Sequence, residues 1–117
     1  MAFIRYKQNL EKIVNRIIYY KQVYKKDLQC GDLVIAFTKN SEYYISVLES
    51  GSYLVMGGWF DKKGLSPVEI EIRGCTWGGN IIKIDIIAAC GLHLEFRNGL
   101  RTTVVKKVVV CRGNAKN

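Results

Sequence analysis

Two glycine-rich segments combine residue types that could bind a nucleotide or another phosphate-bearing ligand. In one of them Trp77 precedes two glycines, with Arg73 and Asn80 close by in the sequence. In the other, Trp59 lies among glycines, a phenylalanine and lysines. An indole ring can stack on a base, which contributes about 1–3 kcal/mol per base, and glycines let a ligand approach the backbone. Either tryptophan could instead be a core or interface residue, with the glycines forming a loop or bulge.

Asn98-Gly99 is the strongest turn signal in the chain. Both residue types accept the positive φ angles of a type I′ turn, so residues 94–97 should pair with residues 100–103 as a tight hairpin. The alternation of residues places Leu94 and its apolar neighbours on one face of that hairpin and Glu95 on the other.

The same hairpin carries further candidate ligand-binding residues: Arg97, Arg101, Thr102 and Thr103. An arginine there could clamp a phosphate through its planar guanidinium, and a threonine hydroxyl could add a hydrogen bond. An exposed hairpin tip, with threonines present for their strand propensity, explains the same residues equally well.

The chain has no recognisable catalytic machinery. His93 is the only histidine, and no spaced serine or metal-binding motif accompanies it. The four cysteines, Cys30, Cys75, Cys90 and Cys111, lack the C-x-x-C spacing of zinc or redox sites. We therefore predict a protein that is not an enzyme and has no metal site and no cofactor. Its cysteines are predicted to be small buried apolar residues, with one or two disulfides as the alternative.

The formal net charge of +8 is divided unevenly along the 117 residues. Residues 1–27 and 97–117 are strongly basic, whereas the residues between them carry an excess of acids. If the two ends of the chain lie side by side, they form one positive surface that would attract a phosphate-rich ligand. A charge that serves only solubility, or that matches the acidic middle of a second copy, remains an alternative.

The elements that would position these residues are one helix and one sheet. Apolar residues from Phe3 to Tyr24 recur at spacings of three and four, which predicts an amphipathic N-terminal helix over residues 1–28. Ile18 and Tyr19 lie outside this stripe, so the helix has apolar side chains on more than one face. This favours a homo-oligomer formed through the N-terminal helix.

From Leu33 onward the apolar period changes to two, which predicts strands. The strands are predicted over 33–38, 42–49, 53–57, 68–73, 81–87, 91–97 and 100–110. Short strands separated by turns indicate an antiparallel, strongly bent β-sheet or a small barrel of SH3-like or OB-like type over residues 31–111. We therefore predict an α+β fold that forms a single domain over residues 1–117, with residues 112–117 as a tail.

Four stretches of the sequence have the character of small phage-encoded β-rich proteins: T-K-N-S-E-Y-Y-I, G-G-W-F, I-R-G-C-T-W-G-G-N and E-F-R-N-G-L-R-T-T-V-V. Over residues 38–110 the chain resembles counter-defence sponges that sequester cyclic nucleotide signals, such as the Thoeris anti-defence family. The resemblance implies a non-enzymatic oligomer with nucleotide pockets between subunits, lined by aromatic and arginine residues.

The leading functional prediction is a binding protein that captures a phosphate-bearing ligand, and the resemblance implies a cyclic nucleotide signal as that ligand. Two alternatives stay open: an SH3-like or OB-like nucleic-acid-binding protein, and a protein-interaction module that inhibits a partner protein. The expected partners are an anionic small molecule (a nucleotide) or nucleic acid, and no membrane, because no apolar run is long enough to span a bilayer. The expected location is cytoplasmic, in the host cytoplasm if the protein is phage-encoded.

Overall fold

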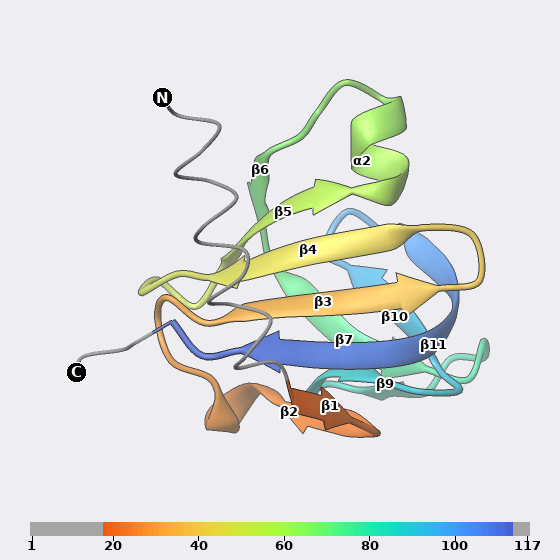
Figure 1. The fold of residues 1–117 in the computed structure, drawn as a ribbon. Coiled ribbons are helices and arrows are strands. Elements are labelled where there is room, and N and C mark those ends of the chain that lie inside the picture. Colours follow the sequence, from red (N-terminus) through yellow and green to blue (C-terminus); the bar gives the residue numbers. More distant parts are fainter. Residues whose placement is uncertain (1–17, 114–117) are drawn as a thin grey trace.

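The computed structural model describes residues 18–113, which are mostly antiparallel β-sheet (Figure 1). The strands are β1 (Ile18–Tyr20), β2 (Gln22–Tyr24), β3 (Leu33–Thr38), β4 (Glu42–Val47), β5 (Tyr53–Gly57), β6 (Val68–Ile70), β7 (Ile72–Thr76), β8 (Ile82–Lys83), β9 (Ile86–Ala89), β10 (His93–Phe96) and β11 (Arg101–Cys111). Within this range the helical elements are a 3-10 turn, η1 (Lys25–Asp27), and the short helix α2 (Gly58–Lys62). The predicted α+β class is therefore wrong.

The predicted N-terminal helix is wrong where the structure describes it. Residues 18–24 form β1 and β2, and β1 pairs with β11 through the registers Ile18↔Val110 and Tyr20↔Val108. β-Branched and aromatic side chains fit a pleated surface well, so a distant partner strand overrides the local helical spacing. Residues 1–17, which carry the rest of the predicted helix, lie outside the described residues.

The main sheet runs in the order β6-β5-β4-β3-β11-β10-β7-β8, and β1 pairs with β11 beside this path. β11 is eleven residues long, and its pairing with β3 shifts register between Val105 and Lys107. Such a bulge bends a strand, so one half of β11 pairs with β3 and the other half with β10. The sheet is strongly bent, but its end strands β6 and β8 do not pair within the described residues, so it is not a closed barrel.

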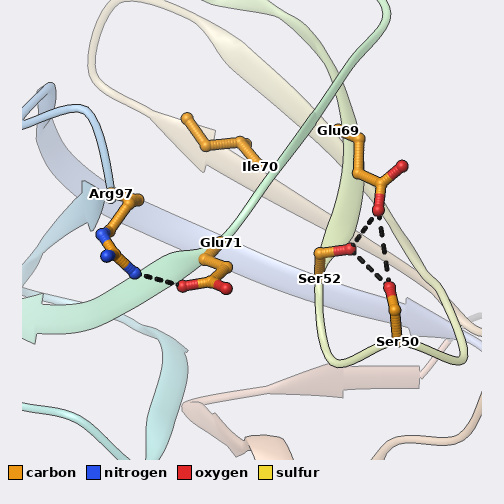
Figure 2. Close-up of a pocket in the computed structure, with 6 residues that line it drawn as sticks. All are labelled: Ser50, Ser52, Glu69, Ile70, Glu71 and Arg97. Atoms are coloured by element: carbon orange, nitrogen blue, oxygen red, sulfur yellow. Dashed lines mark hydrogen bonds and ion pairs between the residues drawn. The ribbon is translucent and has the colours of Figure 1, made fainter.

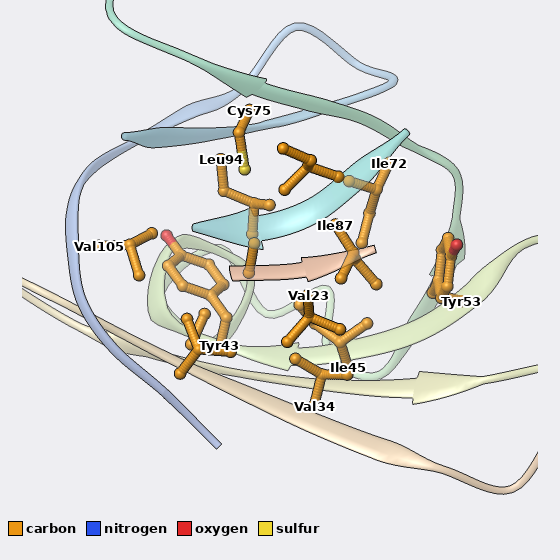
Figure 3. Close-up of a cluster of buried hydrophobic side chains, with 14 of the residues drawn as sticks. Val23, Val34, Tyr43, Ile45, Tyr53, Ile72, Cys75, Ile87, Leu94 and Val105 are labelled. Atoms are coloured by element: carbon orange, nitrogen blue, oxygen red, sulfur yellow. The ribbon is translucent and has the colours of Figure 1, made fainter. Parts of the chain in front are cut away.

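The core lies inside this bend and is closed by β2 and β9, which pair with each other (Figure 3). All four residues of β9 are buried, and Val23 of β2 packs in the same cluster. Val34, Ile45 and Val55 contribute fully buried side chains from three neighbouring strands. Burial of a side chain of this size stabilises the fold by about 1.5–3 kcal/mol.

An aromatic cluster fixes α2 against one end of the core. The Phe60 ring is buried and lies edge-on to Phe96 and to Tyr43, with ring centroids 5.0 and 6.2 Å apart. The Tyr43 hydroxyl also accepts a hydrogen bond of 3.1 Å from the backbone N–H of Trp59. These contacts determine where Trp59 lies, because it is the residue before Phe60 on the same helical turn.

The predicted strands from residue 33 onward are confirmed, with several of their ends displaced or interrupted. The hairpin at residues 94–103 is also confirmed, since Glu95 pairs with Arg101. Its turn is not type I′, because Gly99 has a φ of 91° and no described non-glycine residue has a positive φ. The N–H of Gly99 donates to the carbonyl of Phe96, and this turn followed by a left-handed glycine is the common three-residue hairpin loop.

The cysteines divide into two pairs. All four are free, with Cys75 and Cys111 buried as predicted and Cys30 and Cys90 exposed. The prediction of small buried apolar residues is therefore wrong for the second pair. Among residues 18–113, no helix has the length and apolar character needed to cross a membrane.

Candidate functional site

A buried carboxylate organises the region where the sequence placed its candidate arginines. Glu95 is only 6% exposed, although strand alternation puts it on the outer face of β10. One of its oxygens accepts hydrogen bonds from Arg101 Nε at 3.0 Å and Nη2 at 2.8 Å. Its other oxygen lies 3.8 Å from Arg73 Nη1. Glu95 therefore neutralises part of the positive charge that Arg73 and Arg101 would offer a ligand.

Arg101 also holds the tryptophan-containing loop that follows β7. Its Nη1 donates to the carbonyl of Gly78 at 2.9 Å, and its Nη2 lies 3.4 Å from the carbonyl of Gly79. The loop and the β10–β11 hairpin therefore meet at Arg101. Since most of its guanidinium N–H groups already have acceptors, Arg101 positions the loop and has little left to donate to a phosphate.

Trp77 and Asn80 lie at the exposed tip of this loop. The Trp77 side chain is 60% exposed, and Lys83 Nζ lies 4.9 Å from the centroid of its ring. Two isoleucines on either side of β8, Ile81 and Ile84, are 70% and 68% exposed. The ring can stack on a ligand, and Asn80 is exposed on the same loop.

Arg97 points to a different part of the surface. Its Nη1 forms an ion pair of 2.5 Å with Glu71, in a depression that also contains Ser50, Ser52 and Glu69 (Figure 2). Ser52 donates a hydrogen bond of 2.6 Å to Glu69. With two carboxylates and one arginine, this depression repels an anion, so Arg97 and Arg101 do not form a shared phosphate clamp.

The two candidate threonines have different surroundings. Thr102 is buried, where its hydroxyl accepts from the N–H of Leu94 at 3.1 Å and donates to the carbonyl of Thr103 at 2.7 Å. Thr102 therefore stabilises the hairpin. Thr103 is half-buried, and its hydroxyl oxygen lies 3.4 Å from the backbone N–H of Asn40, which leaves the hydroxyl at the surface of a groove.

That groove brings together four of the residues predicted from the sequence: Trp59, Arg101, Thr102 and Thr103. Its volume is about 170 Å³, and it lies between the β3–β4 turn, α2 and the start of β11. The remaining lining residues are Thr38, Asn40, Ser41, Tyr43, Lys62 and Leu100. We call it the Trp59 groove.

Lys62 and Asn40 are residues of this groove that the sequence analysis did not select. Lys62 is exposed on α2 and adds a positive charge to the lining of the groove, whereas the ammonium over the Trp59 ring is that of Lys63, 5.9 Å from the ring centroid. The β3–β4 turn that contains Asn40 was identified only as a turn. The sequence did contain a signal for Lys62, namely the mixture of glycine, aromatic and lysine residues around Trp59. In a helix, residues three positions apart lie on the same face, so Lys62 could have been grouped with Trp59 once α2 was known to be helical.

A second basic depression, of about 590 Å³, is less suited to an anion. Lys25 and Lys26 line it together with Glu49. The Lys25 ammonium donates to the carbonyl of Ile72 at 2.6 Å, and desolvation by burial lowers its pKa from the usual value. The Lys25 ammonium is therefore already hydrogen-bonded within the protein. The charges of Lys26 and Glu49 are opposite and cancel, so the rest of this depression has no net positive charge.

The described part of the chain has no group of three or more histidine, cysteine or acidic residues that could hold a metal ion. His93 Nδ1 lies 2.7 Å from the carbonyl oxygen of Thr102. A carbonyl only accepts hydrogen bonds, so Nδ1 carries a proton in this contact. The contact positions the imidazole against β11.

Comparison with known proteins gave no relationship: no family model, no curated protein and no solved structure matches this chain.

Proposed function

We propose that the protein is a non-enzymatic binding protein that captures a phosphate-bearing ligand in the Trp59 groove. The observation that carries the proposal is that Thr103 of β11 meets Trp59 and Lys62 of α2 at one groove, although the two elements are about forty residues apart in the chain. An aromatic ring, an ammonium group and a hydroxyl are the complementary groups for a base and its phosphate.

The charges around the groove assign a role to each residue. Arg101 is held by Glu95 and by the loop carbonyls, so its contribution is to the shape of the groove. Lys62 supplies the charge for a phosphate, and Thr103 supplies a hydrogen bond. A base stacks on the exposed part of the Trp59 ring, whose edge-on contact with Phe60, at 5.4 Å between centroids, keeps it in place.

The groove is small and open for a nucleotide site. Pockets that enclose a small molecule usually have volumes of roughly 300–1,000 Å³. A groove of about 170 Å³ would hold a phosphate and one face of a base, with the rest of the ligand outside. This favours a second candidate function, binding of single-stranded nucleic acid, since the exposed Lys39 adjoins Asn40 of the groove and the exposed Lys63 lies 5.9 Å from the Trp59 ring centroid, so both could contact further phosphates.

The test is a titration of the full chain with ATP, with 3′,5′-cyclic AMP, with cyclic di-AMP and with a twelve-nucleotide oligo-dT. Trp77→Phe leaves Trp59 as the single tryptophan, so its fluorescence reports on the groove. We expect at least one of these probes to bind. Trp59→Leu or Lys62→Ala should weaken that binding about tenfold, in the range of one stacked base, as measured by isothermal titration calorimetry, which does not depend on the Trp59 fluorophore. Arg97→Ala, an exposed arginine in the other depression, is the matched control and should bind as the parent does.

Salt separates the two candidates. For a nucleic-acid strand, the slope of log K against log salt concentration should be about −0.7 for each phosphate that the protein contacts. For a single nucleotide, the slope should be no steeper than the value for about one contact. Absence of binding by every probe, or binding that Trp59→Leu leaves unchanged, would overturn the proposal. The counter-defence role and the homo-oligomer stay predictions; the cyclic nucleotides in the panel and sedimentation of the full chain test them.

A further inference from the structure

The outer face of the main sheet carries many apolar side chains, although it is turned away from the core, and its polar members lie mostly at one end, where Lys107 Nζ lies 4.7 Å from the Phe37 ring centroid. Strand registers place Tyr19, Val109, Ile35, Tyr44 and Met56 in one row across β1, β11, β3, β4 and β5. A second row joins Leu33, Ser46 and Leu54, and a third joins Lys107, Phe37 and Glu42. We call these three rows the outer face.

This face departs from the usual pattern of a sheet with one solvated side. Antiparallel strands that cover a core on one face alternate apolar with polar residues, so that the other face meets water. Here the inward residues Val34 and Ile45 are fully buried. Their neighbours along the two strands, Ile35 and Tyr44, point outward and are also large and largely apolar. Tyr19 is 64% and Met56 43% exposed at opposite ends of the first row, Ile35 and Tyr44 are half-buried, and Val109 is 2% exposed. A continuous apolar patch of this kind indicates a covered surface.

The chain itself contains a segment suited to cover it. We propose that residues 1–17 dock on the outer face. This segment is rich in large apolar residues, namely Phe3, Ile4, Tyr6, Leu10, Ile13, Val14 and Ile17. It joins the sheet at Ile18, the first residue of β1, and β1 is the strand at one border of the outer face.

The length of residues 1–17 and their covalent connection to β1 both favour this segment as the one that covers the outer face. Four strand spacings of about 4.8 Å separate β1 from β5, so the face is roughly 19 Å wide. Seventeen residues extend to roughly 56 Å at about 3.3 Å per residue, which is ample to cross it. A tethered segment has an effective concentration of about 1 mM or more, so it outcompetes a second copy of the chain at ordinary protein concentrations.

Photo-crosslinking in the full chain tests the docking directly. Benzoylphenylalanine in place of Leu10 should crosslink to residues 33–37, 42–46 or 54–56 of the same chain. The same group in place of Leu65, which is 48% exposed on the connection after α2, is the control and should not reach these strands. Crosslinks from position 10 to other surfaces only, or none at all, would overturn the proposal.

An equal mixture of chains labelled with nitrogen-14 and nitrogen-15 identifies the source of each crosslink. Crosslinks that join chains of the two masses would show that the face binds a second copy, and would also overturn the proposal.

Hydroxyl-radical footprinting gives a second measurement on substituted full-length chains. Leu10→Asp should raise the labelling of Leu54 and Met56 at least twofold and leave Leu65 unchanged, because a charge disfavours docking on an apolar face. Gln8→Asp adds the same charge at a polar position and should change neither. Equal labelling in the two variants would contradict the docking of this segment.

Discussion

Arg101 and Glu95 are joined by two hydrogen bonds, 3.0 and 2.8 Å long, that end on one buried carboxylate oxygen. The pair links neighbouring strands at the start of the β10–β11 hairpin, where Glu95 and Arg101 are register partners. Its consequence for function is that an arginine which the sequence offers as a phosphate ligand is already bound. The positive charge that a ligand could contact therefore comes from other residues, such as Lys62, and not from Arg101.

Arg101→Met should destabilise the fold. It leaves Glu95 buried without its principal partner and releases the carbonyls of Gly78 and Gly79, and a lost hydrogen bond to a charged group costs about 1.5–3 kcal/mol. Urea denaturation should show a decrease of about 2 kcal/mol in the free energy of unfolding. Arg97→Met is the control, since its exposed ion pair with Glu71 contributes at most about 1 kcal/mol. Equal effects of the two substitutions would contradict the structural role of Arg101.

Asp32 should make stability depend on pH in the acid range. Its burial alone would raise its pKa, but hydrogen bonds from the N–H groups of Gln29 and Gly113 and from Arg112 outweigh burial and hold the pKa below its usual value. Because the folded-state pKa is depressed, this stabilisation is present above about pH 4, near the unfolded pKa, and is lost as pH falls through the folded pKa.

Asp32→Asn tests this dependence. At pH 7 the substitution should lower the free energy of unfolding by about 1–3 kcal/mol, because the ion pair and one charged acceptor are lost. The gap between the parent and the variant should narrow as pH falls below about 4, when Asp32 becomes protonated. Asp85→Asn, at an exposed aspartate, should leave stability unchanged at both pH values. A gap that stays constant from pH 7 to pH 2 would show that the Asp32 charge is not involved.

Gly74→Ala should be strongly destabilising. Gly74 has a φ of 145° in β7, and a Cβ there would overlap the backbone carbonyl of Lys83 on β8. The backbone strain alone costs about 1–3 kcal/mol, and thermal unfolding should show a correspondingly lower Tm. Gly79→Ala is a matched control, because its Cβ would meet open space and its φ is not in the left-handed region. If the control loses as much stability as Gly74→Ala, the close approach of β7 and β8 is not the cause.

The four thiols should react at two different rates. Burial raises the pKa of Cys75 to about 12, and burial also raises the pKa of Cys111. Since the thiolate is the reactive form, iodoacetamide at pH 8 should modify Cys30 and Cys90 in the folded protein and spare the buried pair. Mass spectrometry should find two adducts in buffer and four in concentrated urea. Modification of Cys75 as fast as Cys30 in buffer would contradict its burial.

Much of the sheet could be predicted from the sequence because its signals are local. The strands at residues 33–38 and 53–57 match the predicted bounds, since an alternation of two residues with turn residues at both ends defines a half-buried strand without knowledge of its partners. The hairpin at residues 94–103 followed from Asn98-Gly99 in the same way, although its turn type was wrong.

The described part of the N-terminal prediction failed because Ile18 to Tyr24 satisfy two patterns at once. Tyr20 and Tyr24 fit the helical stripe, but the segment is also rich in β-branched and aromatic residues. For β1, the choice between helix and strand depends on a partner strand about ninety positions later. Ile18 and Tyr19, which did not fit the helical stripe, were the sequence signal for a strand. The spacing of residues within a short segment contains no information about a hydrogen-bonded partner strand that is so distant in the chain.

For the candidate site, the sequence by itself determined which residue types are available: two tryptophans in glycine-rich segments, and arginines and threonines around a hairpin. The tertiary structure decided which of them meet. It buried Glu95 against Arg101, turned Arg97 toward Glu71, and placed Trp59 beside Lys62 and Thr103. Charge can be counted along a sequence, but whether a charged group is free or already paired depends on contacts between segments that only folding brings together.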